Sequence, residues 1–179
     1  MRTQFSMKLK GGVNKLIELP PVTDEEIVIA LRLLNLLIHY ALLWNQELFP
    51  LLIFRVVNFN MTHGMSPQMP SAIALYGAIS NRIGSSVTEA YRYGEVALAL
   101  QQTIGINATW AYITVVNHLS SFLFNKKLSD CLKPLRSGWD SGLKEGESLL
   151  CLEMSFYFPV LSTGTPMFNR GCCSRNDLR

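Results

Sequence analysis

The chain has 179 residues, of which 49% are hydrophobic and only 16% are charged. This length can bury one sizeable hydrophobic core, so we expect one principal domain. The net charge of +3 comes from basic residues scattered along the chain, and this excludes the clustered basic face that is typical of nucleic-acid-binding proteins.

The first helix is predicted to begin after an N-terminal extension and linker, residues 1–22. Pro20 and Pro21 prevent a helix from entering from upstream. Thr23, followed three residues later by Glu26, has the spacing of a capping box, in which the threonine hydroxyl accepts a hydrogen bond from the backbone N–H of the glutamate. We therefore place Thr23 at the start of the helix.

The first two predicted helices, Ile27 to Trp44 and Asn45 to about Thr62, are strongly apolar. Each carries a polar stripe whose members are spaced i, i+3 and i+7. The stripes consist of Arg32, Asn35 and His39 in the first helix, and of Arg55, Asn58 and Thr62 in the second. An arginine near the middle of a bilayer is costly, so membrane insertion is the less favoured interpretation. We expect two mostly buried helices, each with a narrow edge toward water.

Five further helices are predicted, at about residues 71–83, 86–104, 107–124, 128–145 and 148–158. Ser86 and Glu89 form another capping box, and Gly84 is placed to end the preceding helix in the left-handed conformation. The helix over 128–145 is the most amphipathic, and its Trp139 is expected to pack against the helix before it, near Leu119 and Phe122. No hairpin signature occurs in the sequence, which predicts an all-α fold.

The helices also recur with a period. Pairs begin near Ser71, Asn107 and Ser148, intervals of 36 and 41 residues, and tetratricopeptide or related repeats recur at about 34 to 47 residues. Two segments are degenerate forms of the small-and-aromatic pattern of such repeats: Ala90-x3-Gly94-x2-Ala97 and Leu135-x3-Trp139-x2-Gly142. We predict a tetratricopeptide-like array of antiparallel helix pairs over residues 23–158, about seven helices, and an irregular tail over 159–179. A generic helical bundle is the alternative.

Four segments resemble a known family: LIELPPVTDEEIVIALRLL, FPLLIFRVVNFNMTHGMSP, AYRYGEVALAL and LKPLRSGWDSGLKEGE. They are similar to the helical repeat region of large sensor kinases, in which a serine/threonine-kinase-like domain and a STAND-type ATPase precede the array. A GAF sensor domain and a histidine kinase follow it. The resemblance covers about Asn14 to Phe158. Its most specific part is the Leu-Pro-Pro-x-Thr-Asp sequence that leads into the first helix, together with the turn that contains Asn58, Gly64, Ser66 and Pro67.

The resemblance implies a non-catalytic interaction or relay module of a signal-transduction protein, a fragment or truncated relative of such a kinase. Its partners would be another protein or neighbouring domains. The alternative is a piece of an ATP-dependent phosphorelay kinase whose catalytic domains lie outside this chain. Lys10, Gly11 and Gly12 lack the spacing of a phosphate-binding loop, and no kinase motif is present in the sequence. We expect no catalytic, cofactor or metal site, and a cytoplasmic location, since the N-terminus has no apolar signal region.

The remaining candidates for chemistry are the histidines and cysteines. The histidines lie in different predicted helices and are expected to be structural: His39, His63 and His118. The cysteines are expected to be core residues (Cys131, Cys151) or part of a mobile tail (Cys172, Cys173). The last predicted helix, Ser148 to Phe158, carries apolar residues that no following helix covers, which favours self-association or a partner there.

Overall fold

The structure is a computed structural model that describes residues 16–82, 86–105, 110–120, 122 and 126–145. Within these ranges the chain is all-α, with six helices and no strand beyond one isolated bridge. The helices are α2 (Glu25–Trp44), α3 (Leu48–His63), α4 (Met69–Arg82), α5 (Val87–Ile104), α6 (Trp110–Ser120) and α7 (Leu128–Glu145). The prediction of an all-α fold is confirmed. The predicted seventh helix, 148–158, and the tail, 159–179, lie outside the described residues.

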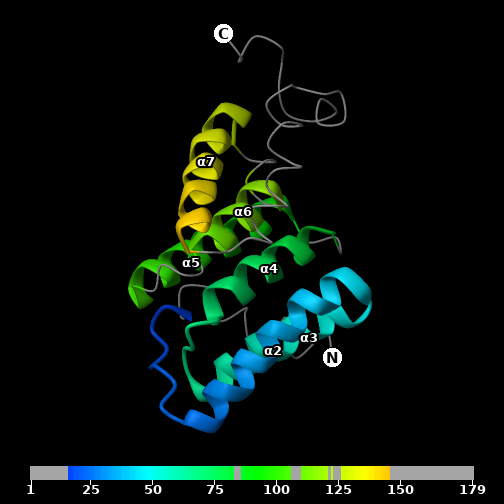
Figure 1. The fold of residues 1–179 in the computed structure, drawn as a ribbon, viewed down its shortest axis with the longest axis vertical. Coiled ribbons are helices and arrows are strands. Elements are labelled where there is room, and N and C mark those ends of the chain that lie inside the picture. The colour runs from blue at the N-terminus through cyan, green and yellow to red at the C-terminus, as the bar shows by residue number, and fades with distance from the viewer. Residues whose placement is uncertain (1–15, 83–85, 106–109, 121, 123–125, 146–179) are drawn as a thin grey trace.

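The helices pack in chain order (Figure 1). Each described helix contacts the next one along the chain, and α4 also contacts α6, its next neighbour but one. Contacts between adjacent and next-but-one helices are those of a stacked helical array, in which each pair lies on its neighbours. The helices α2 and α3 lie at one end of the molecule and α7 lies at the other.

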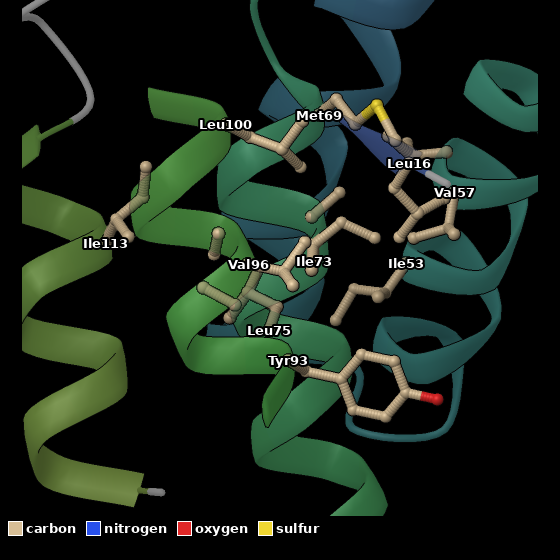
Figure 2. Close-up of a cluster of buried hydrophobic side chains, with 14 of the residues drawn as sticks. Leu16, Ile53, Val57, Met69, Ile73, Leu75, Tyr93, Val96, Leu100 and Ile113 are labelled. Atoms are coloured by element: carbon tan, nitrogen blue, oxygen red, sulfur yellow. The ribbon is translucent and has the colours of Figure 1, made fainter. Parts of the chain in front are cut away.

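The main core lies where α3, α4 and α5 meet (Figure 2). Ile53 and Val57 of α3 face Met69 and Ile73 of α4, all fully buried. Leu16, which precedes α2, is also buried in this core, with 2% of its surface exposed. Residues 16–22, which we assigned to the extension and linker, are therefore packed onto the helices.

Two backbone hydrogen bonds hold this N-terminal segment against the turn that follows α3. The N–H of Met65 donates to the carbonyl oxygen of Pro20 at 2.7 Å, and the N–H of Val22 donates to the carbonyl oxygen of Met65 at 3.0 Å. Gly64 ends α3 with a φ of +111°, and a Cβ at this position would lie 2.6 Å from the carbonyl oxygen of Pro20. Glycine is required here by both the backbone conformation and the close approach.

Three helix starts differ from the prediction: α3 begins at Leu48 and not at Asn45, α4 begins at Met69 and not at Ser71, and the cap of α2 is a different residue. Asp24, and not Thr23, caps α2, since its carboxylate accepts from the N–H groups of Glu26 and Ile27. Both residues favour this position, and the aspartate adds a negative charge at the positive end of the helix dipole. The capping residue Ser86 is confirmed, because its hydroxyl accepts from the N–H of Glu89 at 3.1 Å.

Glycines allow neighbouring helices to approach closely at two crossings. A Cβ on Gly77 of α4 would lie 2.9 Å from the Cβ of Tyr93 and 3.1 Å from the carbonyl oxygen of Ala90, both on α5. A Cβ on Gly94 of α5 would lie 2.7 Å from Cε1 of Phe122, which follows α6. These contacts leave no space for a methyl group, so the two crossings depend on glycine.

Gly77→Ala is expected to lower the free energy of unfolding by about 1–3 kcal/mol, since the new methyl group meets backbone and Cβ atoms that cannot rotate away. Gly138→Ala in α7 is the matched control, because its nearest neighbour, Cγ2 of Thr114, would be 3.4 Å away. The better helix propensity of alanine should make that change neutral or stabilising by up to about 1 kcal/mol. Urea unfolding of both variants tests this, and equal effects would contradict the proposed crossing.

Candidate interaction surface

The outward side of α2 is a continuous apolar surface. We call its seven large side chains the α2 face: Ile29, Leu33, Leu36, Leu37, Tyr40, Leu43 and Trp44. Between 50% and 85% of the surface of each is exposed. The prediction that this helix is mostly buried is therefore wrong. The reason is its position, since α2 lies at the end of the array and has neighbours on one side only.

The inward side of α2 combines apolar and polar contacts. Leu31 and Ile38 are fully buried. Asn35 is half-buried, and its Oδ1 lies 3.5 Å from the hydroxyl of Ser71 at the start of α4. The ring of His39 stacks on Tyr112 of α6, with 5.1 Å between ring centroids, and its Nδ1 lies 3.1 Å from the carbonyl oxygen of Asn35.

The polar stripe of α2 is therefore not a simple edge toward water. Asn35 is half-buried and contacts α4, whereas His39 and Arg32 are exposed, although His39 also stacks on Tyr112 of α6. In α3 the expected arrangement is confirmed, since its stripe carries the exposed residues Arg55 and Thr62 and its opposite side is buried. Leu48 and Leu51, at the start of α3, are also exposed and add apolar surface just beyond the end of α2.

α2 is also long enough to cross a bilayer. It has 20 residues, and only 17% of its most apolar 18-residue window is buried. Length and composition alone therefore admit a membrane-spanning helix. The charged residues around the α2 face are both acidic and basic: Asp24, Glu25, Glu26 and Glu47, and Arg32 and Arg55, all exposed.

The helix at the opposite end of the array, α7, differs from α2 because its outer side is mostly polar. The outer side of α7 carries Lys133, Arg136 and Asp140, all exposed, and Nε of Arg136 lies 3.9 Å from Oδ1 of Asp140. Its inner side packs on α6 through Leu135 and the partly buried Trp139, in a small cluster that also includes Leu119. Trp139 and Leu119 both pack against this cluster, and Phe122 lies against Tyr91 and His118. Direct contact of Trp139 with Leu119 and Phe122 stays a prediction. Apart from the exposed Leu143, the outer side of α7 is polar.

The histidines do not form a common site. His39 is on α2, His63 lies against Phe59 at the end of α3, and His118 is buried in α6. No group of three or more histidine, cysteine or acidic side chains is placed to hold a metal ion in the part of the chain that the structure describes. Cys131 of α7 is buried. The other cysteines, Cys151, Cys172 and Cys173, lie outside the described residues.

The buried polar groups of α6 hold neighbouring segments together. Nδ2 of Asn117 donates to the carbonyl oxygen of Gly94 at 3.0 Å, which joins α6 to α5. Nδ1 of His118 lies 2.7 Å from the carbonyl oxygen of Thr114. A carbonyl can only accept, so Nδ1 carries the proton. Burial lowers the pKa of His118 and is the largest effect. The hydrogen bond to Thr114 raises the pKa, and the positive charge of Lys126 lowers it further.

The lowered pKa of His118 predicts a loss of stability in acid. An unfolded chain binds the proton near the ordinary pKa of about 6.5, before the folded chain does. The free energy of unfolding should therefore decrease as the pH falls below about 6.5, by at most about 1.4 kcal/mol per pH unit for one group. Urea unfolding between pH 7.5 and 5 measures this slope. His118→Asn should make the slope shallower, and an unchanged slope would exclude His118 as the cause.

Comparison with known proteins adds no relative: no protein-family model, curated protein or solved structure matches the chain. The resemblance to sensor kinases therefore stays a prediction from the sequence. The α2 face is the candidate interaction surface that the sequence analysis did not predict. Its signal is present in the sequence as apolar residues spaced alternately by four and three, at positions 29, 33, 36, 40 and 43.

Proposed function

We propose that the chain is a non-catalytic helical interaction module of a signal-transduction protein, and that another polypeptide packs on the α2 face to complete the array. The observation that supports this proposal is the contrast between the two ends. Stacked helical arrays need a polar outer surface on their terminal elements. α7 has such a surface, whereas α2 exposes large apolar side chains on its outer side.

The size of the α2 face supports a protein partner. The largest apolar patch on a typical monomer measures about 300–600 Å². At the observed exposures, the seven side chains of the α2 face present roughly 1,000 Å², because Tyr40 and Trp44 alone contribute a large share. Contact of such a patch with water has an unfavourable free energy, and packing against another apolar surface removes that free-energy cost.

The signalling role rests on the resemblance to the repeat regions of sensor kinases. In such a protein, a partner or neighbouring domain on α2 would favour one packing of the array over another and so transmit a state. The contacts of α2 suit this role. Through Asn35 and His39 it touches α4 and α6, so a change in its position reaches the centre of the array directly.

Photo-cross-linking tests the interaction surface. We expect a photoreactive phenylalanine analogue at position 36, in the expressed chain, to form discrete adducts with a polypeptide that mass spectrometry identifies. The matched control is the same analogue at position 143, since Leu36 is 57% exposed and Leu143 of α7 is 60% exposed. Adducts with lipid alone, or equal adducts at both positions, would contradict a protein-binding role for the α2 face.

The non-catalytic part of the proposal predicts that the purified chain does not bind ATP. The sequence lacks the glycine-rich loop and the Lys-Ser/Thr ending that hold nucleotide phosphates. Equilibrium dialysis with labelled ATP and magnesium checks this. Saturable binding at micromolar concentration, abolished by a single substitution, would instead favour the alternative of a catalytic kinase segment.

A further inference from the structure

We infer that the partner on the α2 face is a second copy of this chain, with the two α2 helices antiparallel about a two-fold axis near Leu36. This inference rests on the proposed function, because it names the polypeptide that completes the array. It is carried by the spacing, symmetry and area of the α2 face, and by the charges around it.

The spacing is that of a helix that packs on another helix along its length. Five residues of the face follow one another at intervals of four, three, four and three: Ile29, Leu33, Leu36, Tyr40 and Leu43. This alternation keeps apolar side chains on one narrow seam, as in the a and d positions of coiled coils. Leu37 and Trp44 flank the seam on the same side of the helix. The seam spans fourteen residues, or about 21 Å of helix.

The ends of the seam are placed symmetrically about Leu36, because Ile29 and Leu43 each lie seven residues from it, while Leu33 and Tyr40 lie three and four residues from it. In a two-fold interface each copy uses the same surface, so residue i of one copy meets residue j of the other and the reverse. With Leu36 on the axis of an antiparallel pair, Ile29 of each copy lies opposite Leu43 of the other. Leu33 then lies beside Tyr40, so a large side chain meets a smaller one on both sides of the axis. In this register the two ends of the seam meet directly, and Leu33 and Tyr40 meet with an offset of one residue.

The available area is sufficient for a stable dimer. Specific protein interfaces bury about 800 Å² on each partner. The α2 face presents roughly 1,000 Å², by the exposures of its seven side chains.

The charges and inner contacts of α2 favour a protein over a membrane. Interfacial helices carry basic residues on the polar side, which attract anionic lipid. Along residues 24–55, which include α2 and the first half of α3, four exposed acidic residues outnumber two exposed arginines: Asp24, Glu25, Glu26 and Glu47, against Arg32 and Arg55. A spanning helix would also have to leave α4 and α6, where Asn35 and His39 make their contacts.

Analytical ultracentrifugation tests the dimer. We expect the full chain to sediment as a dimer at tens of micromolar. Leu36→Lys places two like charges at the axis, so it should raise the dissociation constant at least about 100-fold. Leu143→Lys is the control, because it changes an equally exposed leucine at the other end of the array and should leave the dimer intact. Circular dichroism should show equal helix content in all three proteins.

Cysteine cross-linking tests the antiparallel register without relying on the charged variant. Leu36→Cys should form a disulfide-linked dimer on mild oxidation, in excess of the unsubstituted chain treated alike. Ile29→Cys should cross-link with Leu43→Cys when the two proteins are mixed, and not with itself. Cross-linking of Ile29→Cys with itself would show a parallel pair and would overturn the proposed register.

The outcomes separate this inference from the proposed function. If the full chain is a monomer at tens of micromolar, the inference that a second copy binds the α2 face is wrong. If the analogue at position 36 then still cross-links a different polypeptide, the proposed function as an interaction module is retained. If the chain is a monomer that sediments with neutral phosphatidylcholine vesicles, and Leu36→Lys abolishes this sedimentation, the α2 face binds lipid. That result contradicts both the dimer and the proposed protein-binding function. A dimer that Leu36→Lys dissociates and Leu143→Lys does not supports both.

Discussion

The packing of α4 is the constraint on which the rest of this fold depends. Most of its side chains are buried, and it contacts α3, α5 and α6. Its closest neighbour is α5, which reaches it because Gly77 has no side chain at the crossing. A larger residue there would push α5 outward, and with it α6, which packs on both helices. The order of the array is therefore fixed by one helix at its centre.

Aromatic rings complete the same crossing beside Gly77. The ring of Tyr76 lies edge-on to Tyr93 at 4.8 Å and contacts Phe54 of α3 at 5.8 Å. Burial raises the pKa of Tyr93, so its hydroxyl stays protonated and can donate to Oε1 of Glu89, 3.4 Å away. Rings fill the space beside the glycine, where a helix pair in close contact would otherwise leave a gap.

Local signals in the sequence were sufficient to predict most of the helices. The cap at Ser86 and the glycines at positions 64 and 105 act through the backbone of their own helix, so they can be read without knowing the rest of the fold. Thr23 and Asp24 show the limit of this reading, because two adjacent residues both suit the cap and the choice between them depends on the path of the incoming chain. That path is set by hydrogen bonds to Met65, more than forty residues away.

The orientation of α2 could not be predicted in the same way. Its sequence has apolar residues on nearly all sides, so periodicity alone does not say which side faces the core. We took Asn35 and His39 to mark the side toward water, since polar residues usually do. In the folded chain Asn35 is half-buried against α4, and His39 stays exposed while it stacks on α6. Several leucines of α2 are also exposed. The exposed leucines on the outer side of α2 form the α2 face, which is the candidate interaction surface.

The two ends of the array therefore have different physical roles. Hydrogen bonds and ring contacts at the inner side of α2 hold the helix in place without using its outer leucines, so these remain available for another surface. At the other end, charged side chains on α7 face water, which does not favour further stacking. Among the described helices, the large apolar surface therefore lies on α2 and not on α7. Since α2 and α7 lie at opposite ends of the described part of the molecule, an antiparallel α2 pair would place both α7 helices far from the axis.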